Sequence, residues 1–525
     1  MTDSRYRRLP VGIQSFKVIR EENYLYVDKS DIVWNMVNLG DKYNYLSRPR
    51  RFGKSVLVDT LESYLEGRKD LFEGLKIMQL EKDWKQYPVI RLDMSRGGAN
   101  EDTLRSYLNL RFKDYEEKYN ITPDPTAMLA DRFHAIIATA YKQTGLRVAV
   151  LIDEYDSPLQ HSWRTPEHEK CTGVYREVFA ILKADDEYEH FIFITGITKF
   201  TQISLFSVLN NLSNISFMPE YATICGITEE EIKENFMPEI KQMSEANNWS
   251  VQETHDRLKA YYDGYHFSRR NMVDVYNPYS LVNALKSKEI INFWASSGAT
   301  SLLPKFVDNA ELRMKNFEHC RIMRNTLELS DVSGGGAELF LYQSGYLTIK
   351  DSDEFGYILG FPNEEVKQAL YEMALPALTL RAKSDIQSIQ ANLYAQLGTG
   401  QIDEAMKSLK ALIADVPYSN KKLASMDMEE RYRLIISTIL NAIGLNVEVE
   451  KMISTGRIDM TVKTSRYIYV IELKLRNNGG KDAATEQILN RQYMEPFKAD
   501  KRKVIGLGIE LDENGKGILD WKRAE

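Results

Sequence analysis

The feature that most constrains the fold is a Gly-Lys-Ser triplet between a short strand and a helix. Residues 43–46 read as a strand, the following loop ends in Gly53-Lys54-Ser55, and from Val56 apolar residues recur at helical spacing. This order is the context that a Walker A phosphate loop requires. Backbone N–H groups and the helix N-terminus surround the phosphates, Lys54 supplies a positive charge, and Ser55 offers a hydroxyl to Mg²⁺. We therefore expect a nucleotide to be bound by Arg50, Arg51, Phe52, Gly53, Lys54 and Ser55.

One position departs from the standard Walker A pattern. The first glycine of that pattern falls on Arg48, and glycine is common there because the loop bends sharply. The alternative interpretation is a chance Gly-Lys-Ser at the start of a helix. A second motif is needed to decide between the two.

A Walker B pattern supplies that second motif. Residues 147–152 form a nearly continuous apolar run, typical of a buried parallel strand, and the run ends in Asp153-Glu154. Asp153 would hold Mg²⁺ through water, and Glu154 would polarise the water that attacks the nucleotide. Paired acids after a strand also serve as a helix N-cap. The two motifs in this order favour ATP binding.

Residues 191–195 predict a third strand, which leads into Gly196-Ile197-Thr198-Lys199. In P-loop ATPases of the additional-strand type, such a strand lies between the two Walker strands, and a polar residue at its tip senses the γ-phosphate. Thr195 is our expected nucleotide-binding residue here, with Thr198 and then Lys199 as alternatives. A strand that simply ends in a polar turn is the competing interpretation. Strands alternate with helices throughout this half, which predicts a doubly wound α/β sheet.

The N-terminal half resembles a bacterial family of AAA-ATPase-like proteins. That family's own phosphate loop carries arginine at the position of Arg48, so this residue matches the family pattern. The resemblance implies an ATP-binding, ATP-hydrolysing P-loop fold followed by a helical lid. The matching segments are Leu9-Pro10-Val11-Gly12-Ile13, Tyr26-Val27-Asp28-Lys29-Ser30, Arg48-Pro49-Arg50-Arg51-Phe52-Gly53-Lys54-Ser55, Leu151-Ile152-Asp153-Glu154-Tyr155-Asp156, Thr195-Gly196-Ile197-Thr198-Lys199-Phe200, Tyr262-Asp263-Gly264-Tyr265-His266-Phe267 and Tyr276-Asn277-Pro278-Tyr279-Ser280.

The middle of the chain carries less chemistry. Residues 227–263 read as helical, and the aromatic turn with Tyr265 and His266 is expected to pack rather than to face nucleotide. Ser333-Gly334-Gly335-Gly336 is the most linker-like point. A hairpin over residues 347–361 is compatible with a winged-helix arrangement. We expect an AAA-like core over residues 1–220, a helical lid over 221–310, a linker or winged-helix-like region over 311–380, and a separate α/β domain over 381–525.

Asp459, Glu472 and Lys474 form a second constellation near the C-terminus. Residues 456–462 and 467–475 read as consecutive strands, and the second contains Glu472-Leu473-Lys474. Alternate residues of a strand point to one face, so Glu472 and Lys474 are expected to share a centre with Asp459. An exposed Glu-x-Lys is more commonly a solvated charge pair. The Asp and the order of the elements favour instead the PD-(D/E)xK arrangement of restriction-endonuclease-like domains.

Phosphodiester cleavage requires these residue types, because a divalent cation must activate water and neutralise developing charge. Asp459 and Glu472 would bind Mg²⁺ or Mn²⁺, Glu430 on the preceding helix would complete the metal site, and Lys474 would orient or deprotonate the water. The last part of the chain also resembles the PD-(D/E)xK domain that commonly follows the AAA-like domain. Gln487 matches the glutamine on that family's next helix.

The formal charge of −7 argues against a globally basic nucleic-acid binder, and no apolar stretch is long enough to span a bilayer. We expect a cytoplasmic protein without a membrane partner that acts on nucleic acid, DNA rather than RNA, and we leave a homo-oligomer open. Two functions fit. The first is an ATPase that couples nucleotide state to a metal-dependent nuclease. The second is a non-catalytic regulatory or DNA-binding ATPase whose nuclease fold is only a binding module.

Overall fold

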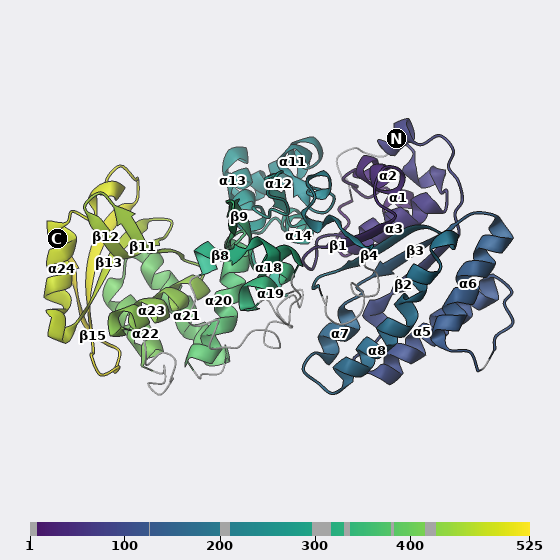
Figure 1. Ribbon diagram of the computed structural model, residues 1–525. Helices are drawn as coiled ribbons and strands as arrows, with labels where there is room; N and C mark the ends of the chain where they lie inside the picture. The colour runs from purple at the N-terminus through teal and green to yellow at the C-terminus, as the bar shows by residue number, and fades with distance from the viewer. Residues whose placement is uncertain are drawn as a thin grey trace. The chain divides into compact units, whose positions relative to one another are not determined.

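The computed structural model describes residues 8–124, 126–199, 211–296, 317–329, 336–379, 383–414 and 427–524. The chain divides into two compact units, whose elements are labelled in Figure 1. One comprises the described residues up to Ser296 together with those from Phe317 to Glu365, and the other comprises the described residues from Val366 onward. Our finer division into four segments stays a prediction, and residues 333–335 of the expected linker lie outside the described residues.

A five-stranded parallel sheet forms the core of the first unit, with strand order β2-β3-β4-β1-β5. The strand that ends in the Walker B acids and the strand that precedes the phosphate loop are separated by β4, as the additional-strand interpretation predicts. The strands are β1 (Tyr43–Ser47), β2 (Val89–Asp93), β3 (Val148–Asp153), β4 (Glu189–Gly196) and β5 (Ser213–Asn214).

Helices cover both faces of this sheet, which makes the fold doubly wound as expected. Figure 1 shows α1, α2 and α3 on one side and α5, α7 and α8 on the other. Strands β3 and β4 are buried almost throughout, because a parallel strand covered on both faces needs apolar side chains on both. The helices are α1 (Phe16–Glu21), α2 (Ser30–Asn38), α3 (Lys54–Leu65), α4 (Ile77–Leu80), α5 (Glu101–Lys118), α6 (Leu129–Thr144), α7 (Ser157–Ser162), α8 (Glu167–Phe179) and α9 (Ile181–Ala184).

A helical subdomain follows in the same unit. Its first helix starts at a reciprocal capping box, in which the Thr228 hydroxyl accepts from the Glu231 backbone and the Glu231 side chain accepts from the Thr228 backbone. Its apolar faces meet in one cluster that includes Phe236, Ile240 and Tyr262. The elements are β6 (Ile227–Thr228), α11 (Glu229–Asn235), α12 (Met237–Asn247), α13 (Val251–Tyr262), β7 (Val275–Tyr276), α14 (Pro278–Ser287) and α15 (Phe293–Ser296).

The first unit ends in a small antiparallel sheet of order β8-β10-β9. Seven of the nine residues of α19 are buried, so protein covers the helix that a winged-helix domain would lay in a DNA groove. The winged-helix interpretation stays a prediction. The elements are β8 (Cys320–Met323), α18 (Arg324–Leu329), α19 (Gly336–Ser344), β9 (Thr348–Ser352) and β10 (Gly356–Gly360).

The second unit is built on a five-stranded mixed sheet of order β11-β12-β13-β14-β15, in which only β13 and β14 run parallel. Successive residues of β13 alternate between two apolar clusters, with Tyr469 and Ile471 in one and Ile468 and Val470 in the other. Figure 1 shows α22 and α23 on one side of the sheet and α24 on the other. The sheet is therefore the middle layer of this unit.

The elements of the second unit are α20 (Glu364–Thr379), whose first residues belong to the first unit, α21 (Lys383–Thr399), α22 (Ile402–Ile413), α23 (Met428–Ala442), β11 (Asn446–Ile453), β12 (Gly456–Lys463), β13 (Tyr467–Leu475), α24 (Gly480–Asn490), β14 (Lys503–Leu511) and β15 (Ile518–Ala524).

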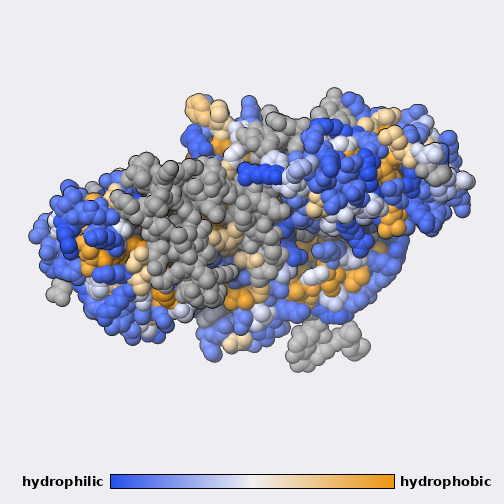
Figure 2. Space-filling model, turned by 90° about the horizontal axis from the view of Figure 1, so that it is seen from below, coloured by the Kyte–Doolittle hydropathy of each residue, from blue (hydrophilic) through white to orange (hydrophobic). Residues whose placement is uncertain are grey.

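The surface view in Figure 2 is predominantly hydrophilic, with hydrophobic side chains in small groups between polar ones. Among the helices in the described part of the chain, none combines the length and apolar character needed to cross a bilayer.

Candidate functional site

The phosphate loop runs from the end of β1 to the start of α3. Gly53 adopts φ 83, a left-handed conformation that strains any residue with a Cβ, and it caps the helix N-terminus. A Cβ built at Gly53 would meet no atom within 4 Å, so the space in front of the helix end is open. The backbone thus presents a helix N-terminus to a volume that an anion can enter.

Lys54 is buried in this loop, with 6% of its surface exposed. Its Nζ donates to the carbonyl oxygens of Arg48 at 3.0 Å and Pro49 at 2.9 Å. Burial lowers the pKa of the Lys54 ammonium, and the nearby carboxylates of Glu154 and Asp153 act in the opposite direction. A buried ammonium of this kind is stabilised by an anion placed against it.

The Walker B residues meet the loop at the end of β3. Asp153 is buried, its side chain is hydrogen-bonded to Ser55, and burial raises its pKa against the effect of that bond. Glu154 adopts φ 46, a strained conformation for a residue with a side chain, and such strain is concentrated at functional sites. Burial also raises the pKa of Glu154, while the charge of Lys54 opposes the shift. Lys54, Ser55 and Asp153 therefore converge as the motifs predicted.

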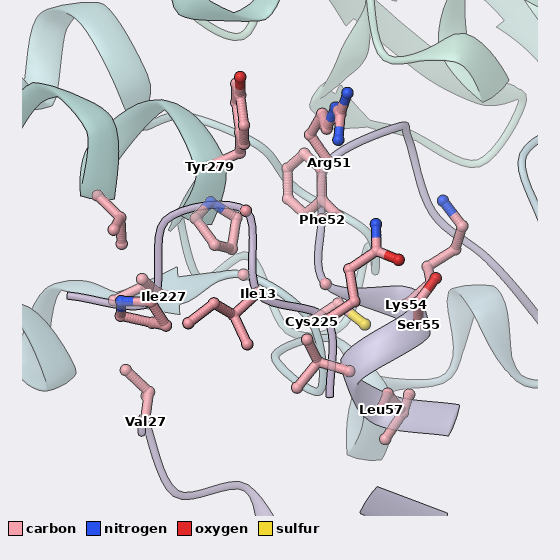
Figure 3. Close-up of a pocket in the computed structure, with 18 of the residues that line it drawn as sticks. Ile13, Val27, Arg51, Phe52, Lys54, Ser55, Leu57, Cys225, Ile227 and Tyr279 are labelled. Atoms are coloured by element: carbon pink, nitrogen blue, oxygen red, sulfur yellow. The ribbon is translucent and has the colours of Figure 1, made fainter. Parts of the chain in front are cut away.

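A cavity of about 490 Å³ adjoins these residues (Figure 3). Its polar end includes Lys54, Ser55 and Glu154. The remainder is lined largely by apolar and aromatic side chains, which come from the N-terminal segment, α3 and the helical subdomain. The apolar part includes Ile13, Val27, Leu57, Ile227 and Tyr279. A cavity of this size with a phosphate-binding end and an apolar remainder fits a nucleotide.

All six loop residues expected to bind nucleotide line this cavity: Arg50, Arg51, Phe52, Gly53, Lys54 and Ser55. Phe52 is buried and packs edge-to-face on Tyr265 with ring centroids 4.7 Å apart. The aromatic turn therefore fixes the loop by packing, as the sequence favoured. His266 is likewise engaged, since its Nε2 lies 2.8 Å from Asp274 and its Nδ1 lies 3.0 Å from the Ile349 carbonyl.

Thr195, the expected nucleotide-binding residue of β4, lies between neighbouring strands. It is fully buried, its hydroxyl donates to the Leu46 carbonyl at 2.8 Å, and it does not line the cavity. The hydroxyl proton is used between neighbouring strands, so Thr195 has none to donate to a phosphate. The alternatives are also engaged: Thr198 Oγ1 donates to Asp156 at 2.7 Å, and Lys199 Nζ donates to the Glu328 carbonyl at 3.0 Å.

Arg48 has a structural role that its position in the motif did not reveal. The guanidinium is buried and donates to the carbonyl oxygens of Ser216 at 2.9 Å and Tyr221 at 2.8 Å. It also lies 4.1 Å from the centre of the Phe267 ring, a cation–π distance. Arg48 therefore anchors the start of the phosphate loop to the segment after β5, where a glycine could make none of these contacts.

The Asp28-Lys29-Ser30 motif joins three parts of the first unit. Asp28 and Ser30 accept the backbone N–H groups of Lys76 at 2.7 Å and Ile77 at 3.0 Å. Lys29, which lines the cavity, forms a 2.6 Å ion pair with Glu231 at the start of α11. The sequence alone gave this motif no role, because its partners lie far away along the chain.

A second polar site lies where β12 and β13 separate in the second unit. Their ladder ends at the pair Met460–Ile471, and the next residues on the two strands are Asp459 and Glu472. Asp459 Oδ2 accepts from the backbone N–H of Leu473 at 2.9 Å, and the Asp459 N–H lies 3.5 Å from Glu472 Oε2. The two carboxylates are therefore neighbours on one side of the sheet, as the spacing predicted.

The surroundings of Glu472 shift its ionisation. Burial, and after it the charge of Asp459, raises the pKa of Glu472 to about 8, and the charge of Lys474 acts in the opposite direction. Lys474 Nζ lies 3.9 Å from Glu472 Oε1, and Gln487 on α24 donates to the same oxygen. Asp459, Glu472, Lys474 and Gln487 thus converge on one centre.

Glu430, the expected third metal ligand, lies at the start of α23. Its side chain is exposed, and the acid that α23 brings to the site is its neighbour Glu429. Glu429 Oε1 accepts from the Leu475 N–H at 3.0 Å, and Glu429 Oε2 lies 3.9 Å from Lys474 Nζ. Successive helical residues point about 100° apart, so only one of two adjacent acids can face the sheet.

The donor set is compatible with a hard divalent cation. Among the described residues, no group of three or more His, Cys, Asp or Glu side chains is arranged to hold a metal. Asp459 and Glu472 supply two carboxylates, and Mg²⁺ commonly uses one or two carboxylates with water and phosphate oxygens completing its shell. The raised pKa of Glu472 also fits, because a cation between the carboxylates would offset their repulsion.

The sequence also gave no role to Arg433, which lies one helical turn after Glu429. Its Nη1 is 3.1 Å from Asp459 Oδ1. The spacing of four residues from Glu429 on a helix is the only signal that could have pointed to it.

These geometries define a P-loop fold of the additional-strand type and a second domain of restriction-endonuclease-like fold. Residues 10–206 match the family model described as predicted AAA-ATPase, and residues 427–521 match the PD-(D/E)XK nuclease superfamily. The chain belongs to the predicted AAA-ATPase family and carries a C-terminal domain of the PD-(D/E)XK nuclease superfamily. It is similar to a protein of Azotobacter chroococcum mcd 1 described as "Uncharacterized protein in vnfD 5'region", with 31% identity over 531 residues covering 98% of both chains.

Proposed function

We propose that this chain is a cytoplasmic ATPase whose nucleotide state controls a metal-dependent nuclease-type domain that acts on nucleic acid, with DNA favoured over RNA. The observation that carries the proposal is the pairing of two complete polar centres on one chain. One centre presents a buried ammonium and a helix end to a cavity, and the other crowds two carboxylates beside a lysine.

ATP hydrolysis is supported by the arrangement at the end of β3. Lys54 and the α3 N-terminus would neutralise the phosphates, and the Ser55–Asp153 pair would hold Mg²⁺. Glu154 lines the cavity and would orient the attacking water. Its strained backbone and buried carboxylate are features of a group held for chemistry rather than for stability.

Phosphodiester cleavage is supported by the side chains at the β12–β13 separation. Asp459 and Glu472 would hold Mg²⁺ or Mn²⁺, which supplies Lewis acidity and an activated water when bound. Lys474 lies 3.9 Å from both Glu472 and Glu429 and would orient that water or remove its proton. Gln487 would fix the orientation of the Glu472 carboxylate.

Control by nucleotide is supported by the way the two units are joined. Their boundary falls within α20, between Glu365 and Val366. Glu365 Oε1 accepts the backbone N–H groups of Phe293 at 2.8 Å and Trp294 at 2.9 Å, which anchors the first turn of α20 to the helical subdomain. Ile227, Pro278 and Tyr279 of that subdomain line the nucleotide cavity. A nucleotide that binds two arrangements of the subdomain differently would shift their populations and carry α20 with it.

The decisive experiment is a cleavage assay with Mg²⁺ or Mn²⁺ on DNA and on RNA, with and without ATP. The proposal predicts metal-dependent cleavage that the Glu472→Ala variant lacks. ATP hydrolysis without any cleavage, together with intact nucleic-acid binding, would instead favour a nuclease fold that serves only as a binding module.

A further inference from the structure

Arg433 is held between two carboxylates at the nuclease-type site. Its Nη1 lies 3.1 Å from Asp459 Oδ1 and its Nη2 lies 2.9 Å from Glu450 Oε1. The Arg433 and Asp459 side chains are each 13% exposed, so water screens their interaction only partly. This contact places a fixed cation directly on a proposed metal ligand.

The position and backbone conformation of Glu450 indicate independently that this part of the sheet has a function other than stability. The β11–β12 ladder pairs Val449 with Met460 and Lys451 with Ile458, which puts Glu450 opposite Asp459. Two acids directly across from each other on neighbouring strands repel. Glu450 also adopts φ 53, a left-handed conformation that costs free energy for a residue with a side chain. Arg433 forms ion pairs with both acids and so links Glu450 to Asp459.

The position of Asp459 does not depend on Arg433 alone. Asp459 Oδ2 accepts from the Leu473 backbone N–H, so the other oxygen is fixed by the sheet itself. The contact with Arg433 therefore contributes mainly charge. A guanidinium on Oδ1 takes a lone pair that a metal ion would use, and it repels a divalent cation that approaches.

We propose that Arg433 exchanges partners: it holds Asp459 while the metal is absent, and it binds a phosphate of the nucleic acid once a divalent cation has taken Asp459. This inference rests on the proposed nuclease function. Guanidinium groups bind phosphate oxygens with two parallel N–H bonds, and a metal on Asp459 and Glu472 would bring a backbone phosphate beside Arg433. Glu450 keeps the guanidinium at the site through Nη2 during the exchange.

The first test measures Mn²⁺ binding to the full chain without nucleotide, by electron paramagnetic resonance of free Mn²⁺. Arg433→Met removes the charge and keeps an apolar stem, so it should bind Mn²⁺ about tenfold more tightly than the unchanged protein. The matched control is Arg457→Met. Arg457 also pairs with Glu450, at 3.1 Å, but makes no contact with Asp459, so this variant should leave Mn²⁺ affinity unchanged. Glu472→Ala gives the binding that belongs to other sites.

The second test measures binding of a DNA duplex in Ca²⁺ by fluorescence anisotropy. Arg433→Met should bind the duplex about tenfold more weakly although it binds metal more tightly, because the phosphate loses its guanidinium. Arg433→Lys keeps the charge, so it should retain the Mn²⁺ affinity of the unchanged protein and lose only part of the duplex affinity. It also serves if Arg433→Met does not fold.

Opposite changes in metal and duplex affinity are specific to the exchange, since a merely structural arginine would lower both. Mn²⁺ affinity in Arg433→Met that equals or falls below that of the unchanged protein overturns the inference. Tight Mn²⁺ binding with the predicted changes but no cleavage of DNA or RNA overturns the proposed nuclease activity and leaves the exchange standing. If neither the unchanged protein nor Arg433→Met binds Mn²⁺ above the Glu472→Ala level, both are wrong.

Discussion

The two polar sites of this chain have opposite electrostatic designs. The phosphate loop buries a positive charge, Lys54, whose pKa burial lowers. The nuclease-type site brings together two carboxylates, partly buried Asp459 and buried Glu472, and the pKa of Glu472 rises to about 8. In each site the unfavourable charge has the sign opposite to that of the ligand that the motif predicts. Binding of the ligand relieves the unfavourable burial of the charge, and this relief contributes to affinity.

The sites also differ in what holds the ligand. The phosphate loop relies on Lys54, backbone groups and a helix terminus, all of which belong to one local segment of the sequence. The nuclease-type site relies on side chains from α23, β12, β13 and α24, which only the sheet brings together. Neighbouring substitutions should therefore differ more in their effect on activity at the second site than at the first. The predictions below test that difference.

The largest effect is expected at the phosphate loop. Lys54→Ala should weaken ATP binding by more than about a hundredfold, because the phosphates lose their charge partner in a buried site. Isothermal titration calorimetry with ATP measures the loss. Thr195→Val is the matched control, because Thr195 donates to Leu46 and does not line the cavity, and it should change ATP affinity less than about twofold. Equal losses in the two variants would support Thr195 as a nucleotide-binding residue.

The second largest effect is expected in the pH dependence of metal binding at the nuclease-type site. Metal binding requires ionised Glu472, whose pKa is raised to about 8 by burial and by Asp459. Below that value the group holds a proton that the metal must displace, so Mn²⁺ affinity should rise by about tenfold per pH unit up to about pH 8 and then level off. Titrations between about pH 6 and 9 measure this slope, with Glu472→Gln as the background at each pH. A flat profile below pH 8 would contradict the assignment.

The raised pKa of Glu472 also predicts how the free energy of unfolding changes with pH. Glu472 binds its proton more tightly in the folded than in the unfolded chain, so without metal the free energy of unfolding should fall as pH rises from about 4.5 to about 8. Thermal unfolding of Glu472→Gln should show a smaller decrease over the same range, because a neutral amide does not ionise.

A smaller effect distinguishes the two adjacent acids at the start of α23. Glu429→Gln should reduce metal-dependent cleavage by about tenfold, because Glu429 lies beside Lys474 and accepts the Leu475 N–H. Glu430→Gln, at an exposed neighbouring position, should leave cleavage within about twofold. Rates measured at saturating Mn²⁺ decide this. The reverse order would show that α23 binds the sheet in another rotation.

The smallest effect concerns communication between the units. Glu154→Gln should retain ATP and lose hydrolysis, and in that trapped state the rate of cleavage should change by about fivefold, within the usual range of coupling free energies. Glu472→Ala should hydrolyse ATP at a nearly unchanged rate. Measuring both activities in both variants tests the coupling. Identical cleavage with and without trapped ATP would mean that the two units are independent enzymes on one chain.

Local sequence determined the parts of this protein whose residues are close along the chain. The Gly53-Lys54-Ser55 loop, the Asp153-Glu154 strand end and the Glu472-x-Lys474 pair were all identified by spacing, because a loop, a strand end and a two-residue period need no distant information. The doubly wound sheet and the C-terminal domain of the nuclease superfamily followed from the same patterns.

Only the tertiary structure decided which side chains are available at each site. The Thr195 hydroxyl donates to the Leu46 carbonyl because those two residues are paired in register on neighbouring strands. The residues next to either one in the sequence do not predict that pairing. Glu429 rather than Glu430 faces the site because the rotation of α23 is set by its packing on the sheet. Arg433 reaches Asp459 for the same reason. Periodicity gives the face of one element, whereas the contacts between elements depend on how their surfaces pack.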